Sequence, residues 1–133
     1  MAMLAETAAF VEDFCARHGI ERDDRLRLTL IVEELFTNTV VHGHGGGADA
    51  AIQIELSRDN GDVNIFYEDG APAFDVLAMI ATAAPDVEAP IDSRVVGGLG
   101  LYLVGQLVCA ARYAYDEGKN RVWLTMRCER EGP

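Results

Sequence analysis

The amino-acid sequence predicts an α+β fold, a two-layer sandwich in which one mostly antiparallel sheet carries helices on one face. Three observations support this class. Apolar residues recur at helical spacing through the N-terminal part of the chain, two hairpin-like segments alternate apolar and polar residues, and an apolar helix lies between those hairpins. The 133 residues suit one domain over residues 1–133.

A first helix is predicted over residues 4–18, where apolar side chains recur along one stripe. Gly19 follows it and suits the left-handed conformation that ends many helices. Phe10 and Phe14 lie beside the stripe, so they fit either the core or a docking surface for a partner.

A second, longer helix is predicted over residues 22–42. Asp23 or Asp24 is suited to cap it, because a carboxylate there accepts hydrogen bonds from free backbone N–H groups. We expect the helix to end at the glycine-rich segment 43–47, which cannot sustain it.

Four strands are predicted in two hairpins. The first joins residues 51–56 to 63–67 through an Asp-Asn-Gly-Asp turn, and the second joins residues 112–116 to 121–128 through a Glu-Gly-Lys-Asn turn. Such hairpins place neighbouring strands antiparallel, as the fold class requires.

Between the hairpins, the sequence predicts a short helix over residues 76–83, a flexible loop over 84–98 and a buried helix over 99–111. The uncharged run 95–111 is shorter than the roughly 20 apolar residues of a membrane span, and it contains glycine and glutamine. It therefore predicts a core helix and no membrane association.

Composition limits the partners and the location. A net charge of −11 argues against direct nucleic-acid binding, and it fits either simple solubility or an acidic face for a basic partner. The three cysteines, Cys15, Cys109 and Cys128, lack paired or metal-binding spacing and predict buried free thiols. Without a recognisable signal sequence, we expect a cytoplasmic location.

The second helix carries one polar series. Glu34, Asn38 and His42 follow at four-residue steps, so they point to one side of the helix. They are either solvent-facing residues or a polar site, with Glu34 as a general base and Asn38 as an oxygen ligand for Mg²⁺. His42 and His44 have no third ligand at fitting spacing, so a metal site there is not expected.

Two loops add weaker signals. Asp69 directly follows a strand, where it is either a turn residue or an acceptor for the amine of a ligand. Gly97, Gly98 and Gly100 open the apolar helix, where they serve either tight packing or the approach of an anion to backbone N–H groups.

Three segments follow one another along the chain: Glu34-Leu-Phe-Thr-Asn38, Asp69-Gly-Ala-Pro-Ala-Phe-Asp75 and Gly97-Gly-Leu-Gly-Leu-Tyr-Leu-Val104. In this order, they resemble the N, G1 and G2 boxes of the GHKL (histidine-kinase-like) ATPases. Within that superfamily, the chain resembles the stand-alone anti-sigma-factor serine/threonine kinases of the RsbW type, from about residue 4 to 128. The resemblance implies their Bergerat-type sandwich.

The resemblance also implies roles for individual residues. Glu34 corresponds to the general base toward a serine or threonine hydroxyl, Asn38 to the Mg²⁺ ligand, and Asp69 to the acid that hydrogen-bonds the adenine amine of ATP. The loop of residues 85–96 corresponds to the ATP lid. The other cofactor-binding positions that it implies are Ala71, Phe74, Arg94, Gly98, Leu99, Gly100 and Leu101.

The implied partners are a STAS-type anti-sigma-factor antagonist, a sigma factor and a second copy of the chain, as a homodimer. We expect ATP binding to depend strongly on Mg²⁺, because a chain of charge −11 repels the bare nucleotide. Ala71 stands where the family usually has glycine. This departure keeps a second hypothesis open, a non-catalytic protein-binding module whose surface depends on nucleotide.

Overall fold

The computed structural model describes residues 2–42, 52–78 and 98–128, with side chains over 6–39, 52–78 and 102–128. Residues 76–78 form a helical turn. The other elements follow in the order α1 (Ala2–His18), α2 (Arg22–His42), β1 (Ile52–Asp59), β2 (Asp62–Asp69), α4 (Gly98–Leu107), β3 (Val108–Asp116) and β4 (Lys119–Met126).

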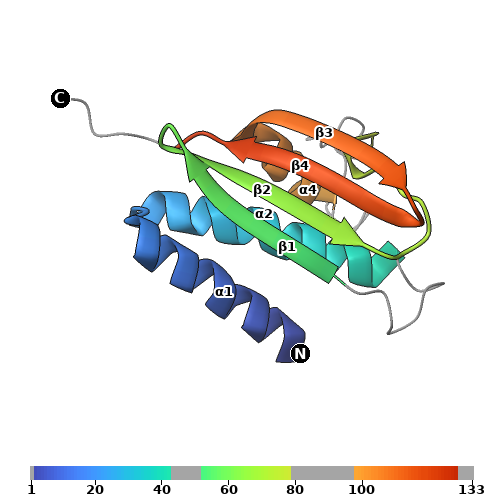
Figure 1. Ribbon diagram of the computed structural model, residues 1–133, viewed down its shortest axis with the longest axis horizontal. Coiled ribbons are helices and arrows are strands. Elements are labelled where there is room, and N and C mark those ends of the chain that lie inside the picture. The colour runs from blue at the N-terminus through green and yellow to red at the C-terminus, as the bar shows by residue number, and fades with distance from the viewer. Residues whose placement is uncertain (1, 43–51, 79–97, 129–133) are drawn as a thin grey trace, which may run out of the picture.

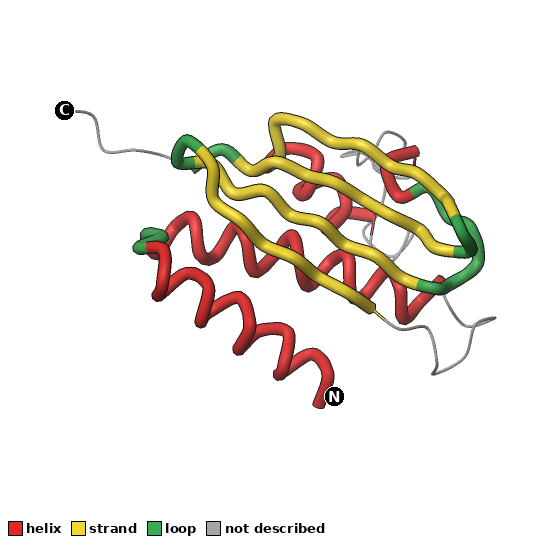
Figure 2. Tube along the Cα trace, in the orientation of Figure 1, coloured by secondary structure: helices red, strands yellow, loops and turns green. Residues whose placement is uncertain are grey.

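The predicted α+β sandwich is confirmed. The four strands form one antiparallel sheet in the order β1-β2-β4-β3, so the two hairpins meet where β2 pairs with β4. In Figure 1 the sheet lies in front, with α2 and α4 behind it, and α1 packs against α2. Figure 2 shows the same two layers, strands in yellow and helices in red.

The core lies between the sheet and the helices. Along β4, every second residue is buried, which is the pattern of a strand with one face on a core. The most deeply buried side chains come from both layers and are Val11, Cys15, Leu28, Ile31, Val32, Val63, Ile65, Val104, Leu124 and Met126.

The turns have the backbone that their sequences predict. Asn60 and Gly61 have φ of 54° and 87°, and Glu117 and Gly118 have φ of 54° and 76°, as in the hairpin turns that match strand twist. Gly19 has φ of 63°, which confirms its role after α1. The Ile20 N–H then donates to the Cys15 carbonyl at 3.0 Å and closes the helix end.

One predicted helix end and one predicted helix cap were wrong. The helix predicted over residues 99–111 ends at Leu107, because residues 108–111 pair with β4 and strand pairing overrides their helix propensity. The second helix begins at Arg22, so neither Asp23 nor Asp24 caps it. Asp24 is instead buried in the first turn and pairs with Arg27 at 2.8 Å.

Three side chains refine the other expectations. Phe14 is buried in the core, whereas Phe10 is 38% exposed, so the two rings do not share one role. Cys15 and Cys128 are buried thiols outside any disulfide, as predicted, but Cys109 is exposed, contrary to the prediction that all three are buried. Among the helices that the structure describes, none combines the length and hydropathy needed to cross a membrane.

Candidate functional site

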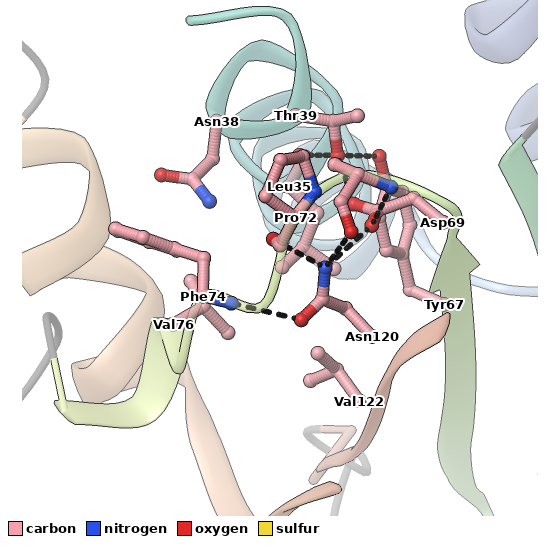
Figure 3. A pocket seen from close by; sticks show the side chains of 11 residues that line it. Leu35, Asn38, Thr39, Tyr67, Asp69, Pro72, Phe74, Val76, Asn120 and Val122 are labelled. Atoms are coloured by element: carbon pink, nitrogen blue, oxygen red, sulfur yellow. Dashed lines mark hydrogen bonds between the residues drawn. The ribbon is translucent and has the colours of Figure 1, made fainter. Parts of the chain in front are cut away.

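A small polar-floored cavity lies between α2 and the sheet, at the edge where β2 ends and β4 begins (Figure 3). Its volume is about 20 Å³, which is room for roughly one water molecule. Three elements and the loop after β2 line it, through Leu35, Asn38, Thr39, Tyr67, Asp69, Ala71, Pro72, Phe74, Val76, Asn120 and Val122.

Asp69 forms the polar floor of this cavity. Its carboxylate is 6% exposed and accepts three hydrogen bonds: Oδ1 from the Ala71 N–H at 3.1 Å and the Asn120 amide at 2.9 Å, and Oδ2 from the Thr39 hydroxyl at 2.7 Å. A carboxylate offers about four acceptor positions. Among the described residues, one position on Oδ2 therefore stays open for a donor from a ligand.

Thr39 and Tyr67 hold Asp69 from the helix side. The Tyr67 hydroxyl lies 2.5 Å from Thr39 Oγ1, and Thr39 also lies 3.2 Å from the Leu35 carbonyl. Burial raises the pKa of the Tyr67 phenol well above its ordinary value, so Tyr67 stays protonated. With Tyr67 donating to Thr39, the single Thr39 proton is free to donate to Asp69.

Asn120 fixes the loop after β2 from the sheet side. It lies directly opposite Asp69 in the β2–β4 ladder and is 5% exposed. Its amide N–H₂ group donates to Asp69 Oδ1 and lies 3.1 Å and 3.0 Å from the carbonyls of Ala71 and Pro72. Its amide oxygen accepts from the Phe74 N–H at 2.9 Å. The Asn120 side chain thus hydrogen-bonds both the start and the end of this loop.

Ala71 fits this loop without a left-handed backbone, since the described non-glycine residues with positive φ are elsewhere, at the two hairpin turns. Its N–H closes a short turn onto Asp69, and its side chain is buried against the cavity. The absence of a glycine here therefore costs no backbone strain. The methyl group does take up space in the wall of the cavity.

Glu34 and Asn38 lie one turn apart on α2, as predicted. The Asn38 side chain points toward the cavity (Figure 3), and no described residue hydrogen-bonds its amide. Burial, together with the neighbouring Glu33 carboxylate, raises the pKa of Glu34 above that of an ordinary glutamate. Among the described side chains, no group of three or more His, Cys, Asp or Glu could hold a metal ion.

The structure thus brings Asn38, Asp69, Ala71 and Phe74 together at one cavity, with Glu34 one helical turn away. Gly98 and Gly100 of the third motif lie at the start of α4, which spans Gly98–Leu107, whereas Gly97 and the side chains of Leu99 and Leu101 lie outside what the structure describes. The described residues do not include Arg94, the rest of the segment 85–96 or His44. The side chain of His42 is also outside the described ones.

The sequence patterns did not predict a role in the site for three residues that position Asp69, namely Thr39, Tyr67 and Asn120. A signal was present at Asn120, because it is a polar residue at an inward-facing position of an alternating strand. Thr39 gave a similar signal, one turn after the apolar Leu35 on α2.

The donor and acceptor pattern fits an adenine ring. The walls are mostly apolar, as a flat aromatic base requires, and the open acceptor position on Asp69 suits an exocyclic amine. Phe74 is half-buried and lines the same cavity, where its aromatic ring adds to the apolar wall.

Fold and site together define a nucleotide-binding domain of the histidine kinase-like ATPase class. The histidine kinase-like ATPase domain family matches residues 1–126, and the chain belongs to that family. Membership implies ATP binding.

Among known proteins, the chain is similar to several called serine-protein kinase RsbW. It is 30% identical to that of Listeria monocytogenes over 104 residues, which is 77% of this chain and 66% of the relative. It is 29% identical over 109 residues to that of Halalkalibacterium halodurans (81% and 66%) and 28% identical over 117 residues to that of Bacillus cereus (86% and 71%). The chain spans about two thirds of the length of these relatives.

Proposed function

We propose that the protein is an ATP-dependent serine/threonine kinase that acts as an anti-sigma factor. It phosphorylates a STAS-type anti-sigma-factor antagonist and sequesters a sigma factor, as a cytoplasmic partner switch. The observation that carries the proposal is the position of Glu34 and Asn38, one turn apart on α2 beside the cavity that holds Asp69. Similarity to the RsbW kinases supports the choice of partners.

Each residue has a distinct task in this proposal. Bound magnesium-ATP supplies the γ-phosphoryl group and leaves as ADP. The Asn38 amide oxygen is a hard ligand suited to Mg²⁺, and Asp69 accepts from the adenine amine. Glu34 takes the proton of the substrate hydroxyl, and its raised pKa makes it a stronger base than an ordinary glutamate.

Glu34→Gln is expected to lower phosphate transfer at least about 100-fold, because it removes the base and keeps the shape of the side chain. ADP binding should be retained, since Glu34 does not line the cavity. The measurement is transfer of labelled phosphate from magnesium-ATP to purified STAS-domain proteins, with ADP binding by calorimetry on the same preparation. Equal transfer by wild type and variant would remove Glu34 from the mechanism.

Glu33→Gln is the matched variant and gives a pH prediction. The Glu33 carboxylate helps to hold the pKa of Glu34 above its usual range, so removing that charge lowers it. The acidic limb of kcat/KM for phosphate transfer should therefore move to lower pH, while activity on the plateau stays within about threefold. A limb that does not move, or that moves upward, contradicts the assignment of Glu34 as the titrating base.

One observation favours the second function, a non-catalytic protein-binding module that depends on nucleotide. The Ala71 methyl group occupies the cavity wall where glycine is usual in the family. In that case, the chain would bind ADP and a partner protein, and no phosphorylated antagonist would form. Formation of phosphorylated antagonist by the wild type would exclude this second function, whereas Ala71→Gly should tighten nucleotide binding in either case.

A further inference from the structure

We propose that Leu26 and Leu30 on α2 form the docking surface for the protein that accepts the phosphoryl group. The partner is a folded protein that presents an apolar strip within about 12 Å of its reactive hydroxyl, and basic side chains beside that hydroxyl. This inference rests on the proposed kinase function. There the hydroxyl oxygen bonds to the γ-phosphorus of ATP, ADP leaves, and Glu34 takes the proton.

The two docking leucines stand in one row with the base. Leu26, Leu30, Glu34 and Asn38 follow at steps of four residues along α2. Side chains at this spacing form a continuous ridge on the surface of a helix. At about 1.5 Å per residue, Leu30 lies about 6 Å and Leu26 about 12 Å from Glu34 along the helix axis. The ridge therefore runs from the nucleotide cavity past the base and onto an apolar surface.

The docking leucines are not needed for the core. Leu26 is 60% exposed, the largest fraction among the large apolar side chains that the structure describes, and Leu30 is half-buried. The opposite side of α2 supplies the core, with Leu28 and Ile31 fully buried. Single exposed leucines are common on protein surfaces. These two differ in their position, one and two turns from a base that has to meet a protein.

A protein whose hydroxyl reaches Glu34 also covers the docking leucines. A general base has to lie about 2.6–3.2 Å from the oxygen whose proton it takes, so the partner touches α2 at Glu34. A specific interface covers about 800 Å² on each protein, which is a radius of roughly 16 Å for a round patch. An interface centred on Glu34 therefore includes both leucines.

A hollow beside Leu26 gives this surface shape. It has a volume of about 590 Å³ and lies at the turn between α1 and α2, with Leu26 and Ile20 among its walls. Most of the affinity of a protein interface comes from a few anchor residues that are seated in such hollows. An apolar side chain that protrudes from the partner can fill the hollow and contact Leu26 there.

The end of the row beside the base is acidic. Glu33 follows Leu30 by three residues and therefore flanks it, next to Glu34. Among the residues that the structure describes, no ion pair engages Glu33. The far end, at the hollow, mixes arginines and glutamates. Basic side chains on the partner are thus favoured beside its hydroxyl, and the net charge of −11 on the whole chain acts in the same direction.

The test is steady-state phosphate transfer from magnesium-ATP to the purified STAS-domain proteins of the genome that encodes this chain. Leu26→Glu should raise the KM for the STAS-domain protein about tenfold or more, because it places a carboxylate in an apolar contact, while kcat stays within about threefold. Leu30→Ala should raise this KM as well. Leu26→Met keeps an apolar side chain and should stay within about threefold of wild type. ADP binding should be unchanged in all three, since neither leucine lines the nucleotide cavity.

Phe10→Glu is the matched control, at another exposed apolar side chain. Glu12 lies 3.5 Å from Arg25 and so marks the side of α1 that faces α2. Phe10 is about 200° around the helix from Glu12, on the side away from the docking leucines. Its KM should match that of wild type, and circular dichroism checks the fold of every variant.

The outcomes separate this inference from the function on which it rests. If wild type transfers phosphate to none of the STAS-domain proteins, the proposed kinase function is overturned, and the docking surface with it. If wild type transfers phosphate and the KM is unchanged in Leu26→Glu and Leu30→Ala, the docking surface alone is overturned. An equal rise of the KM in Phe10→Glu also overturns it, because the effect would then not depend on the row beside Glu34.

Discussion

Asp69→Asn is expected to abolish ADP binding while leaving the fold intact. In the variant, the side-chain oxygen can still accept from Ala71 and Asn120. The new amide can donate to Thr39, whose proton turns to the Leu35 carbonyl at 3.2 Å. Only the position that faces the ligand changes, from an acceptor to a donor. An adenine amine then meets another donor inside a buried site, which costs far more than a lost surface contact.

Thermal melts measure this result. ADP at 100 times its dissociation constant stabilises wild type by about 2.7 kcal/mol, which raises the midpoint by about 5–10 °C. We expect this rise to vanish in Asp69→Asn, with the nucleotide-free midpoint within a few degrees of wild type. Inosine diphosphate, which has an oxygen in place of the amine, should stabilise the variant better than ADP.

The controls separate the purine contact from the metal contact. Asp59→Asn removes one negative charge at an exposed position at the end of β1, so its ADP response should match wild type. Asn38→Ala should lose only the part of the ADP response that depends on Mg²⁺. A full ADP response in Asp69→Asn would show that the nucleotide does not bind in this cavity.

The sequence predicted those parts of the site that are local patterns. The four-residue step from Glu34 to Asn38 is set by the period of one helix, and Asp69 follows a strand that alternation reveals. The bounds of α2 and the identity of all four strands were confirmed for the same reason. Each depends on residues close together in the chain.

The parts that were missed depend on long-range contacts. Asn120 lies 51 residues from Asp69 along the chain, and Thr39 lies 30 from it, so no local spacing connects them. Residues 108–111 were assigned to a helix because their composition suits one, but pairing with β4 decides their state. The cavity exists only after the strand order β1-β2-β4-β3 brings the start of β4 beside the end of β2.

Asn120 should therefore be the most sensitive position for stability outside the apolar core. Asn120→Ala removes one of the two acceptors of the Phe74 N–H, which keeps the Tyr113 hydroxyl at 3.3 Å, and it removes the donor to Asp69 and to the carbonyls of Ala71 and Pro72. Leaving such groups without a partner costs about 1–3 kcal/mol each, and relaxation of the loop recovers part of it. We expect a loss of about 3 kcal/mol in urea unfolding, or about 10 °C in the midpoint.

Two further variants test whether the hydrogen bonds of Asn120 hold the loop after β2, or whether its side chain only fills space. Asn64→Ala removes an amide on the outward face of the sheet, whose hydrogen bond among the described residues is with Thr125, and it should cost less than about 1 kcal/mol. Asn120→Asp keeps the shape and the acceptor but places a second carboxylate beside Asp69. One proton shared between the two acids restores a donor, so the pKa of the pair rises above that of free aspartate.

The sign of the pH dependence follows from that raised pKa. Stability that depends on a bound proton is present at low pH and lost as the pH rises through the folded-state pKa. Asn120→Asp should accordingly be destabilised at pH 7 and recover toward wild type near pH 5, whereas Asn120→Ala should not recover. If both variants lose stability equally at both pH values, the Asn120 amide only fills space, and another contact must hold the loop over the cavity.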